Sequence, residues 1–236
     1  MQRILFLLLG LCLAISGQGQ PLLGAWEATL TDEEGNEYRS VVTITDGYQV
    51  ATEYYADGTL RSTNGGSWSL DGDQMTEVVE FDTRDSSNVG KEITFTIILT
   101  ENTLSVPDGP TWTRLDDGTP GALQGAWLMS GRKRNGEIRT RDTSRPRKTM
   151  KILSGTRFQW IAYNTATKQF MATGGGTYTT KDGKYTENIE FFSRDPSRAG
   201  ASLEFDFALV DGDWHHSGKS SKGDPLYEIW SQRSSQ

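Results

Sequence analysis

Short stretches in which apolar and polar residues alternate recur along the whole chain. Alternation with a period of two is typical of a β-strand that buries one face. The clearest runs are VVTIT (41–45), YQVATEYY (48–55), TEVVEF (76–81), ITFTIIL (93–99), MKIL (150–153), RFQWIAY (157–163), ASLEFDFALV (201–210) and LYEIW (226–230). Asp-Gly turns separate several of these runs, and no long stretch shows the 3.6-residue apolar period of a helix. The pattern predicts an all-β protein, built as a sandwich or as an up-and-down barrel.

The chain also repeats itself over about a hundred residues. The matching segments are LLGAW (22–26) with LQGAW (123–127), GGSW (65–68) with GGTY (175–178), and TEVVEF (76–81) with TENIEF (186–191). Several matches in one order indicate a tandem duplication. The second copy carries insertions within 132–151 and 216–225, and the turn-rich segment RLDDGTPGA (114–122) links the copies.

Each copy begins with Gly-x-Trp and ends close to a basic residue. In these features the chain resembles the lipocalin-like (calycin) group of small β-barrels. The resemblance implies that Arg114 packs across Trp26, and that Arg233 packs across Trp127. A guanidinium over an indole contributes ~0.5–2 kcal/mol. Because the first and last strands meet only where a sheet closes on itself, these pairings favour a barrel over a sandwich.

The expected fold is therefore all-β, with two tandem antiparallel up-and-down eight-stranded lipocalin-like barrels after a signal peptide. We place the first barrel at 21–117 and the second at 118–236. The resemblance further implies a small apolar or amphipathic ligand inside one or both barrels. Each copy is shorter than a typical lipocalin, so we expect the long loops and flanking helix of that family to be missing.

The first twenty residues have the pattern of an export signal. Arg3 is followed by the apolar run ILFLLLGLCLAI and then by the small and polar residues SGQGQ. Twelve apolar residues are too few for a membrane span, which needs about 20. We predict a signal peptide over 1–20 and a secreted or periplasmic protein. Lipidation at Cys12 is the less favoured alternative; Cys12 is the only cysteine, so the mature chain forms no disulfide.

Carboxylates facing the barrel interior are the first candidates for a binding site. In TEVVEF, Glu77 shares a strand face with two apolar residues, and Glu187 does the same in TENIEF. Glu80 and Glu190 lie on the opposite face and are predicted to point to solvent. An interior carboxylate either anchors a ligand or acts as an acid–base group, or it is paired within the core. The residues themselves favour the paired, structural interpretation.

Aromatic residues supply the rest of the candidate ligand site. Tyr54 and Trp68 in the first copy join Glu77, and Trp160 and Tyr178 in the second copy join Glu187. Barrels of this size are often filled by side chains, so filling the core is an equal alternative for these aromatic residues.

Catalytic and metal-binding patterns are not evident. His215 and His216 are adjacent, and neighbours in a strand point to opposite faces, so both cannot bind one metal; a surface hairpin is the favoured interpretation. We predict no cofactor and no metal. Three functions stay open: a ligand-binding protein, a scaffold with filled barrels, and an isomerase or hydratase in which Glu77 or Glu187 acts with a tyrosine.

Charge differs sharply between the two copies. Residues 21–118 hold 19 acidic and 5 basic residues, whereas residues 119–236 hold 12 acidic and 18 basic residues. Nine basic residues lie within 132–151 alone, which makes an anionic partner possible there. We expect this insertion to be mainly a solvent-facing or inter-domain loop. An exported, net-acidic chain without an aromatic–basic RNA-binding signature predicts no nucleic-acid partner.

Overall fold

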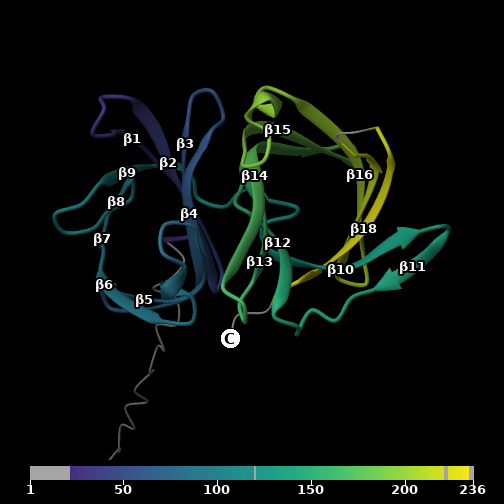
Figure 1. Cartoon of the computed structure of the whole chain (residues 1–236), viewed down its shortest axis with the longest axis horizontal. Helices are drawn as coiled ribbons and strands as arrows, with labels where there is room; N and C mark the ends of the chain where they lie inside the picture. The colour runs from purple at the N-terminus through teal and green to yellow at the C-terminus, as the bar shows by residue number, and fades with distance from the viewer. Residues whose placement is uncertain (1–21, 120, 221–222, 234–236) are drawn as a thin grey trace, which may run out of the picture.

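The computed structural model describes residues 22–119, 121–220 and 223–233, and these form two antiparallel β-barrels (Figure 1). The all-β prediction and the division into two barrels are confirmed. The last strand of the first barrel ends at Asp116 and the first strand of the second begins at Gly125. The predicted signal peptide lies outside the described residues.

The first barrel is nearly closed. Its strands are β1 (Gly24–Thr31), β2 (Glu37–Thr45), β3 (Tyr48–Tyr55), β4 (Leu60–Asp71), β5 (Gln74–Asp82), β6 (Glu92–Thr96), β7 (Ile98–Leu99), β8 (Thr103–Ser105) and β9 (Thr111–Asp116), with the 3-10 helix η2 (Ser86–Asn88) between β5 and β6. The sheet order is β6-β5-β4-β3-β2-β1-β9-β8-β7. Because only the buried Ile97 separates β6 from β7, one continuous segment joins the two ends of the sheet.

The second barrel is closed by eight strands. Its elements are β10 (Gly125–Arg134), β11 (Glu137–Thr140), β12 (Arg147–Leu153), β13 (Arg157–Asn164), β14 (Gln169–Lys181), β15 (Lys184–Phe192), η3 (Pro196–Arg198), β16 (Ser202–Val210), β17 (Asp213–Lys219) and β18 (Pro225–Gln232). Pairing of β10 with β18 completes the ring. The ninth strand, β11, pairs only with the end of β10 and lies outside the ring.

The repeated Gly-Ala-Trp has a physical cause at the start of each barrel. Gly24 has a φ of +120°, and a Cβ there would lie 2.0 Å from the Asp116 carbonyl oxygen, so only glycine fits against the closing strand. The indole of Trp26 donates a hydrogen bond to the Leu22 carbonyl oxygen (3.0 Å), and Trp127 donates to Leu123 (2.9 Å) in the same way. A large apolar ring is thereby buried with its N–H satisfied.

The predicted closure is confirmed in the first barrel and wrong in the second. The guanidinium of Arg114 lies 3.9 Å from the ring centroid of Trp26. In the second barrel, Gln232 and not Arg233 is the strand partner of Trp127. A shift of one residue along a strand reverses the face that a side chain occupies. Arg233 therefore points out of its own barrel.

Glycine pairs kink one strand of each barrel. The register of β4 against β5 shifts between Gly65 and Gly66, and that of β14 against β15 shifts between Gly175 and Gly176. A Cβ on Gly66 would lie 1.9 Å from a carbonyl oxygen of the neighbouring strand. These glycines mark β-bulges at which the sheet bends.

The two barrels pack side by side through β2–β5 and β12–β15 (Figure 1). The contact is reciprocal: a tyrosine of each barrel binds a glutamate of the other barrel, and the two tyrosines and the two glutamates occupy equivalent positions in the repeat. The Tyr54 hydroxyl of the first barrel donates to Glu190 of the second (2.5 Å), and the Tyr163 hydroxyl of the second donates to Glu80 of the first. Tyr54 also stacks on Phe191, with ring centroids 4.7 Å apart.

Glu80 and Glu190 are consequently not the solvent-facing residues that the strand pattern predicts. Both point out of their own barrel, but the neighbouring barrel covers them. Arg233 contacts Glu80 through two nitrogens, and Arg157 does the same for Glu190. Burial raises the pKa of each carboxyl group, but the adjacent guanidinium outweighs burial and holds the pKa below its ordinary value. Both carboxylates are therefore charged at neutral pH.

Replacing Trp26 with alanine should test how much the closure contributes to stability. Trp26 is fully buried, so Trp26→Ala should lower the free energy of unfolding by about 3–5 kcal/mol, measured by urea denaturation. Ile138→Ala, at an exposed position, is the control and should stay within about 0.5 kcal/mol of the wild type. A loss below about 1 kcal/mol for Trp26→Ala would show that Trp26 does not hold the barrel closed.

Candidate functional site

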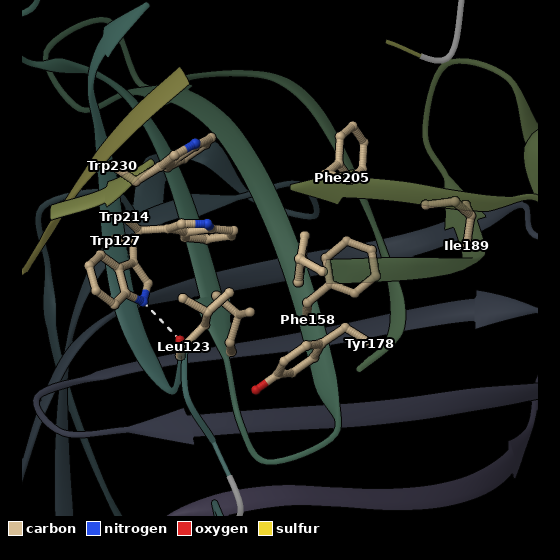
Figure 2. Packing of buried hydrophobic residues seen from close by; sticks show 10 residues of the cluster. Leu123, Trp127, Phe158, Tyr178, Ile189, Phe205, Trp214 and Trp230 are labelled. Atoms are coloured by element: carbon tan, nitrogen blue, oxygen red, sulfur yellow. Dashed lines mark hydrogen bonds between the residues drawn. The ribbon is translucent and has the colours of Figure 1, made fainter. Parts of the chain in front are cut away.

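The second barrel encloses a cavity of about 570 Å³. Its apolar walls include Met129, Trp160, Ile189, Leu203, Phe205 and Trp230. One end of the barrel is filled: Leu123, Trp127, Phe158 and Tyr178 pack there and do not line the cavity (Figure 2). Ser197 and Arg198, at η3, line the other end, where side chains are partly exposed. The cavity therefore reaches the surface at the η3 end.

A buried ion pair lies in this cavity. The Nζ of Lys151 is 2.8 Å from Oε1 of Glu187, and both side chains are more than nine-tenths buried. The same ammonium lies 4.8 Å from the ring centroid of Trp214, 5.0 Å from that of Tyr185 and 5.2 Å from that of Trp230. The ammonium is thus held by one carboxylate and by the faces of aromatic rings.

Two further titratable groups, His216 and Glu228, line the same cavity. The His216 Nδ1 is 3.5 Å from Glu228 Oε2, and neither ring nitrogen has a hydrogen-bond partner within the described residues. Burial, and then the charge of Lys151, lower the pKa of His216. Burial raises the pKa of Glu228, but His216 and Lys151 outweigh burial and lower the pKa overall. At neutral pH we expect a neutral imidazole beside a charged carboxylate.

The first barrel holds a cavity of about 580 Å³. Its apolar walls include Val42, Ile44, Met75, Phe95, Leu104 and Trp112. Glu77 lines this cavity with 8% of its surface exposed, and its Oε1 accepts a hydrogen bond from the Gln49 amide nitrogen. No lysine, arginine or histidine is among the described residues that line it. Burial raises the pKa of Glu77 to about 7; the Gln49 hydrogen bond opposes this shift, and Asp82 adds to it.

The six predicted site residues separate into three groups. Glu77, Trp160 and Glu187 line the cavities. Trp68 and Tyr178 pack in the core: the Trp68 indole donates to the Thr45 carbonyl oxygen (2.9 Å) and the Tyr178 hydroxyl to that of Ser154 (2.6 Å).

Tyr54 points away from the cavity of its own barrel and lies between the two barrels.

Sequence reasoning missed Lys151, Gln49 and His216. Lys151 was counted with the basic insertion, yet it is 4% exposed and faces the barrel interior. Its position in the strand offered a signal, because it is flanked by Met150 and Ile152, which face the other barrel. The expected surface hairpin is wrong for His216, which is buried in the cavity, while His215 lies on the outer face beside Tyr227.

Residues 133–140 of the basic insertion are all exposed to solvent, whereas Met150 at its end is buried and Thr149 lines the second cavity. The end of β10 and β11 form a hairpin that projects away from the first barrel (Figure 1). Arg132 and Arg139 are directly opposite each other across it, so like charges face one another. None of the basic residues between 132 and 147 forms an ion pair within the described residues.

Fold and cavities together define a tandem β-barrel protein with two separate interior cavities. Residues 122–235, which contain the second barrel, match the family described as a domain of unknown function, DUF4488. No curated protein matches the chain. Within residues 22–119, 121–220 and 223–233, no three His, Asp or Glu side chains are placed to hold a metal ion. The same residues include no helix long and apolar enough to cross a bilayer.

Removing one partner of the buried ion pair should destabilise the protein. Lys151→Met leaves the Glu187 carboxylate without its counter-ion and should lower the free energy of unfolding by about 3–5 kcal/mol in urea denaturation. Replacing both partners, as Lys151→Met with Glu187→Met, should recover most of that loss. Lys184→Met, which removes an exposed cation beside Asp206, is the matched control and should have no measurable effect. Equal effects at the two lysines would contradict a buried pair.

Stability should depend on pH through Glu77. The native protein holds the Glu77 proton up to a pKa of about 7, whereas the unfolded chain releases it near 4.5. The native protein therefore binds more protons in this window, so the stability contributed by Glu77 is fully present below pH 4.5 and is lost as pH rises through about 7. Relative to Glu77→Gln, the wild type should lose about 2–3 kcal/mol between pH 5 and pH 8 in urea denaturation. Parallel pH profiles for the two proteins would contradict the raised pKa.

Proposed function

We propose that this is an exported protein that binds small apolar or amphipathic molecules inside its barrels. The observation that carries the proposal is the open cavity in each barrel, of about 570 and 580 Å³. Ligand sites are commonly about 300–1,000 Å³, whereas a barrel of eight strands can be filled completely by its own side chains. A scaffold that works only through its surface has no use for such space.

The composition of the cavity walls supports the same function. Each cavity has apolar walls and an interior carboxylate at the same strand position, Glu77 or Glu187; the second cavity also contains Glu228. Apolar walls with a few fixed polar groups are the usual composition of a ligand site, since the walls supply affinity and the polar groups set orientation. The resemblance to lipocalin-like barrels points in the same direction, and export rests on the predicted signal peptide.

An isomerase or hydratase is less well supported. Such an enzyme would use an interior carboxylate together with a tyrosine. The first cavity, where the carboxyl of Glu77 has a raised pKa, has no tyrosine among its described lining residues. In the second cavity, Glu187 is paired with Lys151.

The projecting hairpin supports a second role. We also propose that its basic residues contact an anionic partner. They are mostly exposed, carry no ion pair within the described chain, and extend away from the first barrel. Binding through this surface would fall with rising salt concentration, because exposed charges are screened.

Titration with the neutral fluorescent probe 1-N-phenylnaphthylamine tests the binding proposal. The wild type should bind the probe at two sites. Ala51→Trp combined with Leu104→Trp adds two indoles to the walls of the first cavity and should remove the first site; Leu203→Trp should remove the second. Ile138→Trp, which adds an indole on the exposed hairpin, should change neither. Absence of saturable binding, or binding unaffected by both cavity variants, would contradict the proposal.

A further inference from the structure

The two cavities hold their carboxylates at equivalent positions but differ in the counter-ion. Glu77 is paired across the sheet with Trp68, and Glu187 is paired with Tyr178 at the same place in the other barrel. The strand partner of the first Gly-x-Trp tryptophan is Val42, whereas the partner of the second is Lys151. One barrel therefore has valine at the position where the other has lysine.

This difference leaves the first cavity without an internal cation. In the second barrel, Lys151 extends from that position to within 2.8 Å of Glu187. In the first barrel the apolar Val42 lies there, and no cationic side chain is among the described residues lining the cavity. The hydrogen-bond partner of Glu77 is the neutral amide of Gln49. Glu77 is thus a buried carboxylate that faces open, mostly apolar space with no positive charge beside it.

We propose that the first cavity binds amphipathic amines, with the ligand's protonated amino group taking the place that Lys151 holds in the second barrel. This inference rests on the proposed binding function and adds the ligand class. The ammonium would pair with Glu77, and the apolar chain would lie against the walls formed by Ile44, Phe95 and Leu104. The Gln49 amide nitrogen already donates to Glu77, which leaves its carbonyl oxygen as a second acceptor for an ammonium N–H.

A cationic head group suits the first cavity better than an anionic or a neutral one. A carboxylate in an apolar cavity is costly when charged, and a paired ammonium recovers much of that cost. A second carboxylate would repel Glu77, and an alcohol would offer one neutral hydrogen bond where an ammonium offers charge-assisted ones. The raised pKa of Glu77, about 7, agrees with a carboxyl group that lacks a cation when the cavity is empty. The second cavity supplies its own cation and should show no preference for amines.

Three ligands of equal chain length test the inference: octylamine, octanol and octanoate. Each is used at pH 8 to displace 1-N-phenylnaphthylamine from the Leu203→Trp protein, in which the first cavity remains open. Octylamine should bind at least about tenfold more tightly than octanol, because a hydrogen bond to a charged group outweighs a neutral one. Octanoate should bind more weakly than both.

Variants at two positions should remove this preference. Glu77→Gln keeps the shape of the side chain and should bring octylamine and octanol to within about twofold of each other. Val42→Lys should have the same effect by supplying an internal cation, while Val42→Met, of similar length and uncharged, should keep the preference. Near-ultraviolet circular dichroism shows which variants fold. If Val42→Lys does not fold, the result with Glu77→Gln still tests whether Glu77 causes the amine preference. The protein with both Ala51→Trp and Leu104→Trp, in which only the second cavity is open, should not distinguish octylamine from octanol.

The failures of the two proposals differ. Equal displacement by octylamine and octanol in the Leu203→Trp protein, unchanged by Glu77→Gln, would overturn the amine inference and leave ligand binding intact. An equal amine preference in the second cavity would overturn the counter-ion argument in the same way. No saturable probe binding by the wild type would overturn the binding proposal, and the amine inference with it.

Discussion

Burial of carboxylates is the constraint on which the rest of this structure depends. The equivalent strands β5 and β15 each carry two glutamates on opposite faces, Glu77 with Glu80 and Glu187 with Glu190. One of each pair enters its own barrel and the other enters the contact between barrels. A carboxylate withdrawn from water needs a cation or several hydrogen bonds. The position of each glutamate's partner determines how the barrels pack and how their cavities differ.

The contact between the barrels has the form of a two-fold interface within one chain. Tyr54 binds Glu190 and Tyr163 binds Glu80, and in both cases the partners occupy equivalent positions in the repeat. Self-complementary contacts of this kind are typical of symmetric dimers. The cations around the two glutamates have diverged: Arg157 comes from β13, one of the strands in the contact, whereas Arg233 follows the last strand, β18. The duplicated barrels therefore share a packing geometry and differ in the charges that support it.

Most of the fold could be predicted from sequence, and the reasons lie in particular residues. Alternation in segments such as 48–55 and 76–81 shows strands, because one face is buried throughout. Asp-Gly pairs between these segments indicate the turns that connect the strands. The candidate site was harder to predict. Period-two patterns placed Glu77 and Glu187 inside the barrels, but could not show that the Tyr54 side chain points toward the neighbouring barrel. A face directed away from one core looks solvent-exposed until its covering partner is known.

By itself, the sequence determined the duplication, the β class and the interior carboxylates, since each follows from local spacing or from a repeated motif; the Trp26–Arg114 closure was implied by the resemblance to lipocalin-like barrels. Only the tertiary structure decided where the side chains of Arg233, Glu80 and Lys151 lie. Arg233 missed Trp127 because the strand register placed Gln232 there, and register depends on the whole closed sheet. Glu80 is largely shielded from solvent because a second barrel covers it, and Lys151 lies inside because β12 has both faces buried. These outcomes depend on contacts between segments distant in the chain, which local patterns do not contain.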